Sequence, residues 1–192
     1  MKHLRIAPNW LRYFIVVVLL LGVCFRFVNL DGKVFWHDET FTMLRVSGYT
    51  ASEVKREVFN GRVITSDSLA KFQGVNNDRG LIDTINSLAI EDPQHPPLYY
   101  ILARFWVAIF GNSVTAIRCL SAVISLLLIP SMYWLCYLLF RVPLGAPYFA
   151  VALTLCSPIL FVYSTEAREY ILWAVTILLS SGCLLRAIKV EE

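Results

Sequence analysis

The sequence predicts an all-α protein: a polytopic bundle of transmembrane helices with a large extracytoplasmic first loop that contains short interfacial helices. Apolar residues make up 57% of the 192 residues and charged residues only 16%, against about 45–50% and about 25% in soluble domains. The mean hydropathy is +0.61, and several apolar runs approach the ~20 residues that a membrane-spanning helix needs. This composition excludes a disordered chain, a coiled coil and an ordinary soluble enzyme. The net charge of +3 is too small to suggest a nucleic-acid partner.

We expect one membrane domain, residues 1–192, with four spans. The first span follows the basic residues Lys2, Arg5 and Arg12, and no small-residue cleavage site follows it. It is therefore interpreted as an uncleaved helix whose basic end lies in the cytoplasm. Pro130 and Pro158 are expected to kink two of the later spans. The expected spans are residues 12–30, 115–140, 147–164 and 169–185.

Residues 31–95 are expected to form a polar outer loop, and residues 96–111 a short apolar helix embedded in the outer face of the membrane. This helix is shorter than a full crossing requires. If it did cross, as a fifth span, Arg141 would lie outside. Four spans place Arg141 in the cytoplasm with the basic N-terminus, as the positive-inside rule favours. They also gather the unusual polar motifs on the extracytoplasmic face of a plasma or inner membrane.

Two helices are expected within the outer loop. A capping box formed by Thr50 and Glu53 opens a helix over residues 51–59. Apolar residues at helical spacing from Leu81 to Ala89 predict an amphipathic helix that could lie on the membrane surface. The five cysteines all lie in apolar runs and are interpreted as small apolar fillers, without disulfides.

Arg26 and Arg104 fall near apolar interiors. We expect both to extend to the membrane surface or to pair with a loop acid. The aromatic residues of the short apolar helix, which are Tyr99, Tyr100, Phe105 and Trp106, are interpreted as interfacial packing.

The acid pair Asp38-Glu39 follows the first span closely. Two adjacent carboxylates at a membrane surface can hold a divalent metal or deprotonate a hydroxyl. The alternative is a solvated pair of loop acids without a chemical role.

A second acidic motif contains Glu91, Asp92 and His95 among three prolines, directly before the short apolar helix. Proline restricts the backbone, which suits a site whose ligands are placed before the substrate arrives. Glu91 with His95 is compatible with Zn²⁺, and an Asp/Glu pair with Mg²⁺ or Mn²⁺. The alternative is that these residues only mark the start of a helix.

Three residues near the outer ends of the later spans are candidates for binding a lipid phosphate: Arg118, Arg168 and Tyr170. Guanidinium groups form charge-assisted, bidentate hydrogen bonds with phosphate. The alternative is that they anchor the helices at the interface, where Tyr and Arg are common.

The order of these motifs resembles the amino-terminal part of the GT-C membrane glycosyltransferases, in the family 39 group that includes protein O-mannosyltransferases and aminoarabinose transferases. The resemblance covers roughly residues 10–186. It is carried by the acid pair 38–39, the segment from Asp92 to Tyr100 with His95-Pro96-Pro97, the segment 110–113 with Arg118, and the segment from Tyr163 to Tyr170.

The resemblance implies transfer of a sugar from a polyprenyl-phosphate carrier to an acceptor on the extracytoplasmic side, with inversion. It implies that Asp38, with Glu39 beside it, is catalytic. It implies that Glu91 or Asp92 is the second acid, near His95, and that Arg118 and Arg168 lie close to the donor. The acceptor is a protein, lipid or glycan, and a divalent metal is an open question.

Family members are usually several hundred residues longer than this chain. We therefore expect a fragment, or a chain that needs a second membrane subunit. The alternatives are a non-catalytic subunit that binds lipid phosphate, and a small transporter component. A transporter predicts charges that face a path through the bilayer, whereas most charges here cluster on one predicted face.

Overall fold

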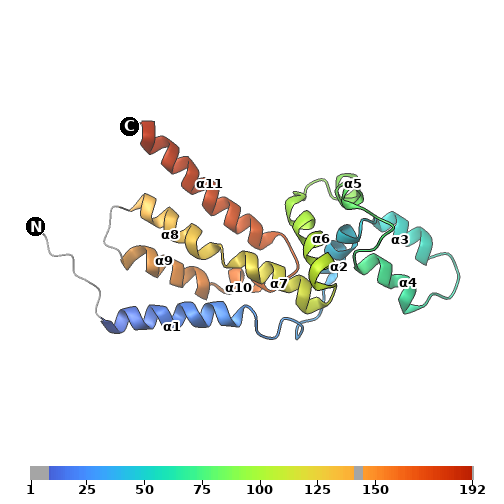
Figure 1. Cartoon of the computed structure of the whole chain (residues 1–192), viewed down its shortest axis with the longest axis horizontal. Helices are drawn as coiled ribbons and strands as arrows, with labels where there is room; N and C mark the ends of the chain where they lie inside the picture. Colours follow the sequence, from blue (N-terminus) through green and yellow to red (C-terminus); the bar gives the residue numbers. More distant parts are fainter. Residues whose placement is uncertain (1–8, 141–144, 192) are drawn as a thin grey trace, which may run out of the picture. The chain divides into compact units, whose positions relative to one another are not determined.

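The computed structural model describes residues 9–140 and 145–191, and every regular element in these residues is a helix (Figure 1). The predicted all-α membrane helix bundle is confirmed. Lys2, Arg5 and Arg141, on which the expected orientation depends, lie outside the described residues. The helices are α1 Asn9–Phe25, α2 His37–Ser47, α3 Ala51–Val58, α4 Ser66–Ala70, η1 Lys71–Gln73, α5 Leu81–Glu91, α6 Leu98–Phe110, α7 Val114–Ser125, α8 Leu128–Leu139, α9 Gly145–Cys156, α10 Pro158–Ser164 and α11 Tyr170–Glu191.

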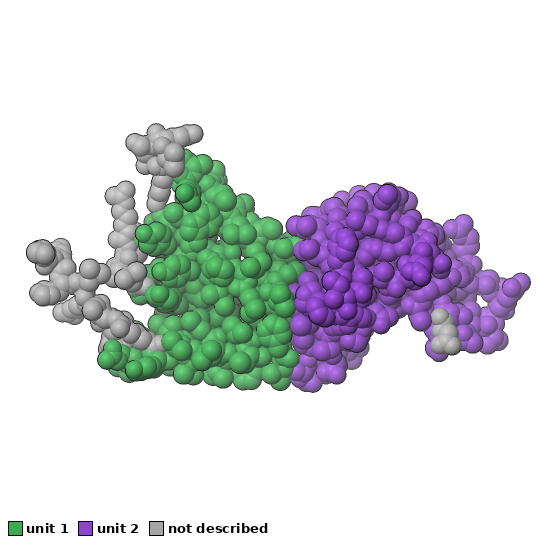
Figure 2. Space-filling model, in the orientation of Figure 1, with its two compact units in different colours: residues 1–28, 121–166, 170–192 green, residues 29–120, 167–169 purple. Residues whose placement is uncertain are grey.

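The chain divides into two compact units (Figure 2). Unit 1 consists of residues 1–28, 121–166 and 170–192. Unit 2 consists of residues 29–120 and 167–169. The short segment 167–169, between α10 and α11, therefore packs with a unit that is otherwise built from the first half of the chain.

Unit 1 contains most of the apolar helices, with α8 packed against α9 and α11, and α1 packed against α9. Among the residues that the structure describes, two helices are long and apolar enough to cross a membrane: Val114–Leu139, which joins α7 and α8, and Tyr170–Ile188. The pair α9 and α10 is bent by 63° and would add a third span if it counts as one. The helices α1 and α6 are apolar but shorter.

One of these helices bends at a proline, as the sequence predicts, and the hydrogen-bond pattern of another is interrupted one turn before a proline. The 63° bend between α9 and α10 lies directly before Pro158. The break between α7 and α8 lies at Leu126 and Leu127, whose amides bond three residues back. Pro130 has no amide hydrogen to bond the carbonyl of Leu126, which explains why the regular pattern is interrupted one turn before it.

Arg26, at the end of α1, corrects an expectation. Its side chain is fully buried rather than extended to the surface or paired with an acid. The guanidinium donates to the carbonyls of Gly22 and Leu155, which lie in the last turns of α1 and α9. Helix ends carry unpaired carbonyls and partial negative charge. Arg26 therefore joins the ends of two helices within unit 1.

Unit 2 is built around α2, which packs against α5, α6 and η1. Its apolar cluster contains Leu44, Tyr49 and Phe72. The predicted capping box opens α3 as expected: Thr50 accepts from the amide of Glu53, and the Glu53 carboxylate accepts from the amide of Thr50.

The predicted amphipathic helix at Leu81 is confirmed as α5, but the side that it buries is partly polar. Thr84, Ser87 and Leu88 are buried, whereas Ile82 and Ile90 are exposed. Arg104 explains the polar part, since its guanidinium donates to the hydroxyl of Thr84.

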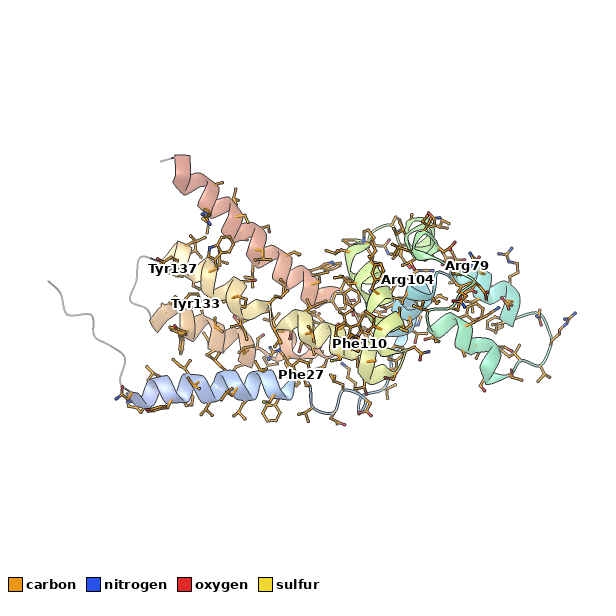
Figure 3. All side chains as sticks on the ribbon, viewed as in Figure 1. Phe27, Arg79, Arg104, Phe110, Tyr133 and Tyr137 are labelled. Carbon is orange, nitrogen blue, oxygen red and sulfur yellow. The ribbon has the colours of Figure 1, made fainter. Side chains whose placement is uncertain are left out.

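Arg104 is the second correction, because it does not extend to a surface. It is buried and donates to the carbonyls of Val46 and Arg79 as well as to Thr84. Figure 3 shows Arg104 and Arg79 close together on the same unit. Arg104 therefore ties α6 to the end of α2 and to the start of α5.

Candidate active site

Glu39 and Arg118 form a buried ion pair, and both side chains are 0% exposed. Arg118 Nε lies 2.8 Å from Glu39 Oε1, and Nη2 lies 2.6 Å from Oε2, so the pair is bidentate. The remaining donors of Arg118 bond the carbonyls of Leu30, Lys33 and Val34. This geometry holds the segment before α2 against α7.

Glu39 also fixes the segment between α10 and α11. Its Oε1 accepts from the amide of Ala167 at 2.8 Å, and its Oε2 accepts from the amide of Trp36 at 3.3 Å. Each carboxylate oxygen therefore accepts two hydrogen bonds. The next residue after Ala167 is Arg168, so the buried pair also determines where Arg168 lies.

Asp38 has different surroundings from its neighbour Glu39. It is partly exposed and lines a cavity of about 190 Å³ in unit 2, together with His37, Phe41, Arg45, Asp92, His95, Tyr100 and Arg168. Successive residues of a helix point about 100° apart, because the helix has 3.6 residues per turn. One carboxylate of the acid pair thus reaches the cavity, while the other is buried in the unit.

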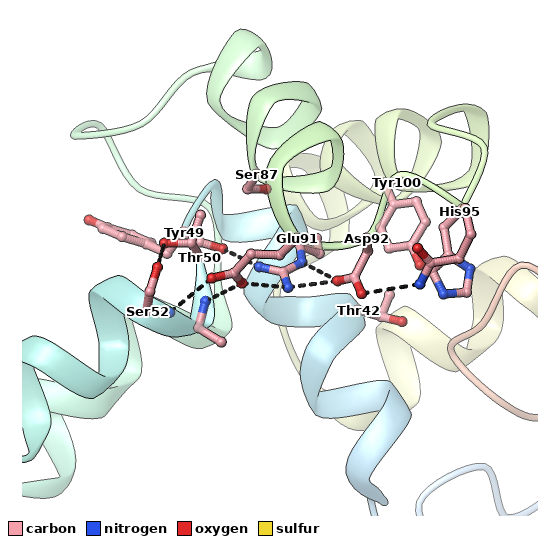
Figure 4. A network of polar contacts seen from close by, with 12 residues as sticks. Thr42, Tyr49, Thr50, Ser52, Ser87, Glu91, Asp92, His95 and Tyr100 are labelled. Atoms are coloured by element: carbon pink, nitrogen blue, oxygen red, sulfur yellow. Dashed lines mark hydrogen bonds and ion pairs between the residues drawn. The ribbon is translucent and has the colours of Figure 1, made fainter.

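Arg45 joins the second acidic motif to α2. Its Nη2 lies 2.8 Å from Glu91 Oε2 and 2.6 Å from Asp92 Oδ2, and its Nε donates to Asp92 at 2.7 Å. Figure 4 shows the network of polar contacts that contains Glu91 and Asp92, with His95 and Tyr100 beyond Asp92. Asp92 lines the cavity, whereas Glu91 does not.

Glu91 also caps the N-terminus of α3. Its carboxylate accepts from the amides of Ala51 and Ser52, at 2.6 Å and 3.0 Å. Although burial acts to raise the pKa of Glu91, these two amides and Arg45 lower that pKa to about 2. Glu91 is therefore an ionised structural acid at neutral pH.

Glu169 is a buried carboxylate that contacts three side chains. Its Oε1 lies 2.6 Å from His95 Nδ1 and 3.3 Å from Arg168 Nη2, and its Oε2 accepts from the Tyr100 hydroxyl at 3.2 Å. Burial raises the pKa of the Tyr100 phenol, and the charge of Glu169 raises it further. Tyr100 therefore stays a hydrogen-bond donor to Glu169 at neutral pH.

Arg168 lies between Asp38 and Tyr100. Its Nη1 is 3.4 Å from the Asp38 carbonyl, 3.2 Å from the Thr42 hydroxyl and 3.4 Å from the Tyr100 hydroxyl. A guanidinium and a carboxylate thus line one cavity, and an imidazole lines it as well.

The sequence-predicted residues fall into three groups. Asp38, Asp92, His95 and Arg168 line the cavity. Glu39, Glu91 and Arg118 lie in ion pairs and do not line it. Tyr170 belongs to unit 1, where its ring packs against Tyr163 and Trp173.

Sequence reasoning missed Arg45 and Glu169, and it interpreted Tyr100 as interfacial packing. Arg45 bonds Asp92 across 47 residues of sequence, and Tyr100 bonds Glu169 across 69. No local spacing could reveal such pairs. The available signals were the position of Tyr100, five residues after His95, and that of Glu169, next to Arg168, each within a motif already selected.

The proposed metal ligands Glu91 and His95 do not fit a metal site. Glu91 is bonded by two amides and a guanidinium, and His95 Nδ1 faces Glu169. Within residues 9–140 and 145–191, no group of three or more His, Cys, Asp or Glu side chains could hold a metal ion.

These features define a helical membrane protein whose polar unit holds a cavity lined by a carboxylate, an imidazole and a guanidinium. The family model for dolichyl-phosphate-mannose-protein mannosyltransferase matches residues 94–192, just over half of the chain. The chain belongs to this family, which is of the GT-C type of membrane glycosyltransferases. The match includes His95, Arg118 and Arg168 and begins after the acid pair 38–39. Neither a search of curated proteins nor one of solved structures found a significant match.

Proposed function

We propose that this chain forms the catalytic part of a membrane glycosyltransferase that moves a sugar from a polyprenyl-phosphate carrier to a hydroxyl acceptor. The observation that carries this proposal is that the two adjacent acids have different surroundings. Asp38 lines the cavity, whereas the Glu39 carboxylate is bound by Arg118 and two backbone amides. A carboxylate in a cavity can take the proton of an attacking hydroxyl.

In this proposal, the acceptor oxygen attacks the anomeric carbon while the bond from that carbon to the carrier phosphate breaks. The acceptor proton passes to Asp38, and the bonding electrons leave with the phosphate. One such displacement inverts the anomeric centre, as in single-displacement glycosidases. The atoms and electrons of this step balance without a metal ion. The chain's own cationic side chains can stabilise the negative charge of the leaving phosphate.

Arg168 is the better placed of the two predicted arginines for the carrier phosphate. It lines the cavity with Asp38, whereas Arg118 is 0% exposed and bound to Glu39 and three carbonyls. A guanidinium placed where negative charge develops stabilises the transition state. We propose that Arg118 positions Glu39 and Ala167, and through them Arg168.

We further propose that the N-terminus lies in the cytoplasm and that the cavity opens on the extracytoplasmic side. The basic N-terminal residues favour this orientation. A lipid-linked donor is compatible with an extracytoplasmic site, because such a donor supplies the sugar without a nucleotide. The partners in this proposal are the carrier lipid and a hydroxyl acceptor on a protein, lipid or glycan.

The experiment measures transfer of radiolabelled mannose from polyprenyl-phosphate-mannose to a Ser/Thr-containing peptide by the full chain in membranes. Asp38→Asn should lower the rate by at least about a hundredfold, because the general base is lost. It should leave expression and thermal stability unchanged. The matched control is Asp31→Asn, a carboxylate that is exposed in the same segment, and it should retain full activity.

Glu39→Gln separates chemistry from structure. It should lower the thermal stability strongly, because breaking one partner of a buried ion pair costs about 3–5 kcal/mol. Retained transfer in Asp38→Asn would refute the assignment of the base. Absence of transfer by the parent chain, with binding of the donor intact, would instead support a non-catalytic lipid-phosphate-binding subunit.

A further inference from the structure

Phe41 differs in chemistry from the other residues of the cavity. Among the described residues that line this cavity, Phe41 alone has a side chain without a polar atom. Its side chain is partly exposed, so apolar surface borders a space that charged and hydrogen-bonding groups otherwise line. Covering this surface with an apolar part of a ligand would remove it from water, which is favourable. The proposed reaction assigns no role to this ring.

Contacts with the protein fix the position of the Phe41 ring. Phe41 packs against the apolar cluster of unit 2. The His37 ring lies one turn earlier in α2, and the two ring centroids are 4.7 Å apart. The guanidinium carbon of Arg45, one turn later, lies 5.8 Å from the Phe41 centroid. The ring is therefore held in place before a ligand arrives, which lowers the entropic cost of binding.

Phe41 also lies close to the groups that the proposed reaction uses. It follows Asp38 by three residues in α2, and side chains at this spacing are neighbours on one face of a helix. Arg168, the proposed phosphate-binding residue, lines the same cavity. In the proposed reaction, the sugar lies between the carrier phosphate and the base. Phe41 is therefore next to the place where the transferred sugar is expected.

The volume of the cavity favours a single sugar ring as its occupant. The volume is about 190 Å³, whereas sites for drug-sized ligands have about 300–1,000 Å³. A peptide segment or an oligosaccharide is too large for this space, but one pyranose ring is small enough. A pyranose carries hydroxyls around its rim and C–H groups on its faces. It therefore matches both the polar groups of the cavity and the apolar ring of Phe41.

We propose that Phe41 is a specificity-determining residue, whose aromatic ring packs against a C–H face of the transferred sugar. The sugar in this proposal is the one that the proposed glycosyltransferase function supplies, so the proposal rests on that function. The polar side chains of the cavity bind the sugar hydroxyls. The ring favours a carrier lipid that bears a sugar, whereas the carrier lipid without a sugar makes no contact with Phe41.

Binding of two lipids, one with a sugar and one without, tests the role of Phe41. The probes are radiolabelled polyprenyl-phosphate-mannose and polyprenyl phosphate, each titrated against the full chain in lipid nanodiscs. Phe41→Leu keeps an apolar side chain but removes the ring. It should weaken binding of polyprenyl-phosphate-mannose by about two- to tenfold, the range for one aromatic contact. It should leave the affinity for polyprenyl phosphate unchanged.

Three further variants serve as controls. Phe41→Tyr keeps the ring and should bind both lipids as the parent chain does. Phe59→Leu is the matched control, because Phe59 is 79% exposed in the same unit and does not line the cavity; it should have no effect. If Phe41→Leu fails to fold, Phe41→Met takes its place with the same expectation, because the flexible methionine side chain fills irregular apolar space.

Several results would overturn the proposal. Equal weakening for both lipids in Phe41→Leu would mean that Phe41 acts only through the fold. Unchanged binding of polyprenyl-phosphate-mannose in Phe41→Leu, or no binding of this lipid to the parent chain, would exclude a contact with the sugar. A loss in Phe41→Tyr as large as in Phe41→Leu would show that the ring is not what the ligand requires.

Kinetics distinguishes the transferred sugar from the acceptor. Phe41→Leu should raise KM for the lipid-linked sugar and leave KM for the peptide unchanged. The reverse pattern would place the ring against the acceptor and overturn the proposal. The binding measurements do not require transfer, so they decide the role of Phe41 even if the parent chain transfers no sugar. Transfer by the parent chain with no effect of Phe41→Leu would refute the role of Phe41 and keep the proposed function.

Discussion

At the scale of single residues, Asp38 and Glu39 show how adjacent carboxylates acquire different roles. Taking an ion pair out of water is costly and is repaid only when the charges are well bonded. Glu39 meets this condition through two bonds from Arg118 and two from backbone amides. These bonds make it a poor proton acceptor, which is why the proposed function assigns proton transfer to Asp38.

Glu91 provides a residue-scale prediction that depends on pH. Its pKa of about 2 lies below the ordinary 4.5, so the ionised form is the one that the folded state favours. Its contribution to stability is therefore present above pH 4.5 and is lost as the pH falls from about 4.5 toward about 2. Glu91→Gln should cost about 1.5–3 kcal/mol at pH 7, and this difference from the parent chain should shrink over the acidic range.

Thermal unfolding of both chains in detergent from pH 7 to pH 3 measures this difference. Glu57→Gln is the matched control, because Glu57 is half-exposed and such surface pairs with lysine contribute little. A Glu91→Gln difference that stays constant across the pH range would show that the ionised carboxylate does not stabilise the fold.

The same residues show what sequence can predict about a site. Asp38, Asp92, His95 and Arg168 were selected from motif order, and all four line one cavity. The residues that contact them, Arg45 and Glu169, were not predicted, because they bond partners that are far away in the sequence. Burial decides which acid of a pair is exposed, and burial depends on what packs against α2.

At the scale of helices, local signals predicted the elements well. The capping box at Thr50 and the bend at Pro158 follow from chemistry within a few residues. The helix α2 was not predicted, because its sequence HDETFTMLRVS has no clear apolar period. Its stability comes from packing against α5 and α6, which sequence patterns do not report.

Gly182 in α11 provides the prediction at this scale. A Cβ at this position would lie 2.5 Å and 2.7 Å from two ring carbons of Trp134 in α8, well inside van der Waals contact. Gly182→Ala gains about 1 kcal/mol of helix propensity but incurs an overpacking cost of about 1–3 kcal/mol. The net result should be a loss of up to about 2 kcal/mol in thermal stability.

A second variant tests whether Trp134 is the cause. In a Trp134→Leu background the ring is absent, so Gly182→Ala should become stabilising by about 1 kcal/mol. Ser180→Ala, at an exposed position in the same helix, should have little effect in either background. The same sign of the Gly182→Ala effect in both backgrounds would rule out the close approach of α8 and α11.

At the scale of the whole molecule, the charged residues with assigned contacts are concentrated in unit 2, and the apolar helices form most of unit 1. Composition predicted this separation, since the outer loop holds most of the chain's acids. Composition could not predict that residues 167–169, between two apolar helices, would join the polar unit. That segment supplies Arg168, which lines the cavity, and Glu169, which contacts side chains that line it.

The proposed orientation gives the prediction for the whole molecule. In a chain whose five cysteines are replaced by serine, single cysteines are placed at Val63, which is fully exposed in unit 2, and at Ala187, exposed near the end of α11. A membrane-impermeant maleimide applied to intact cells should label position 63, because the outer loop faces the exterior. Position 187 should react only after permeabilisation, because four crossings return the chain to the cytoplasm. Labelling of both positions in intact cells would mean an odd number of crossings, either because α6 crosses as a fifth span or because the bent pair α9 and α10 does not cross. Labelling of position 187 alone would reverse the proposed orientation.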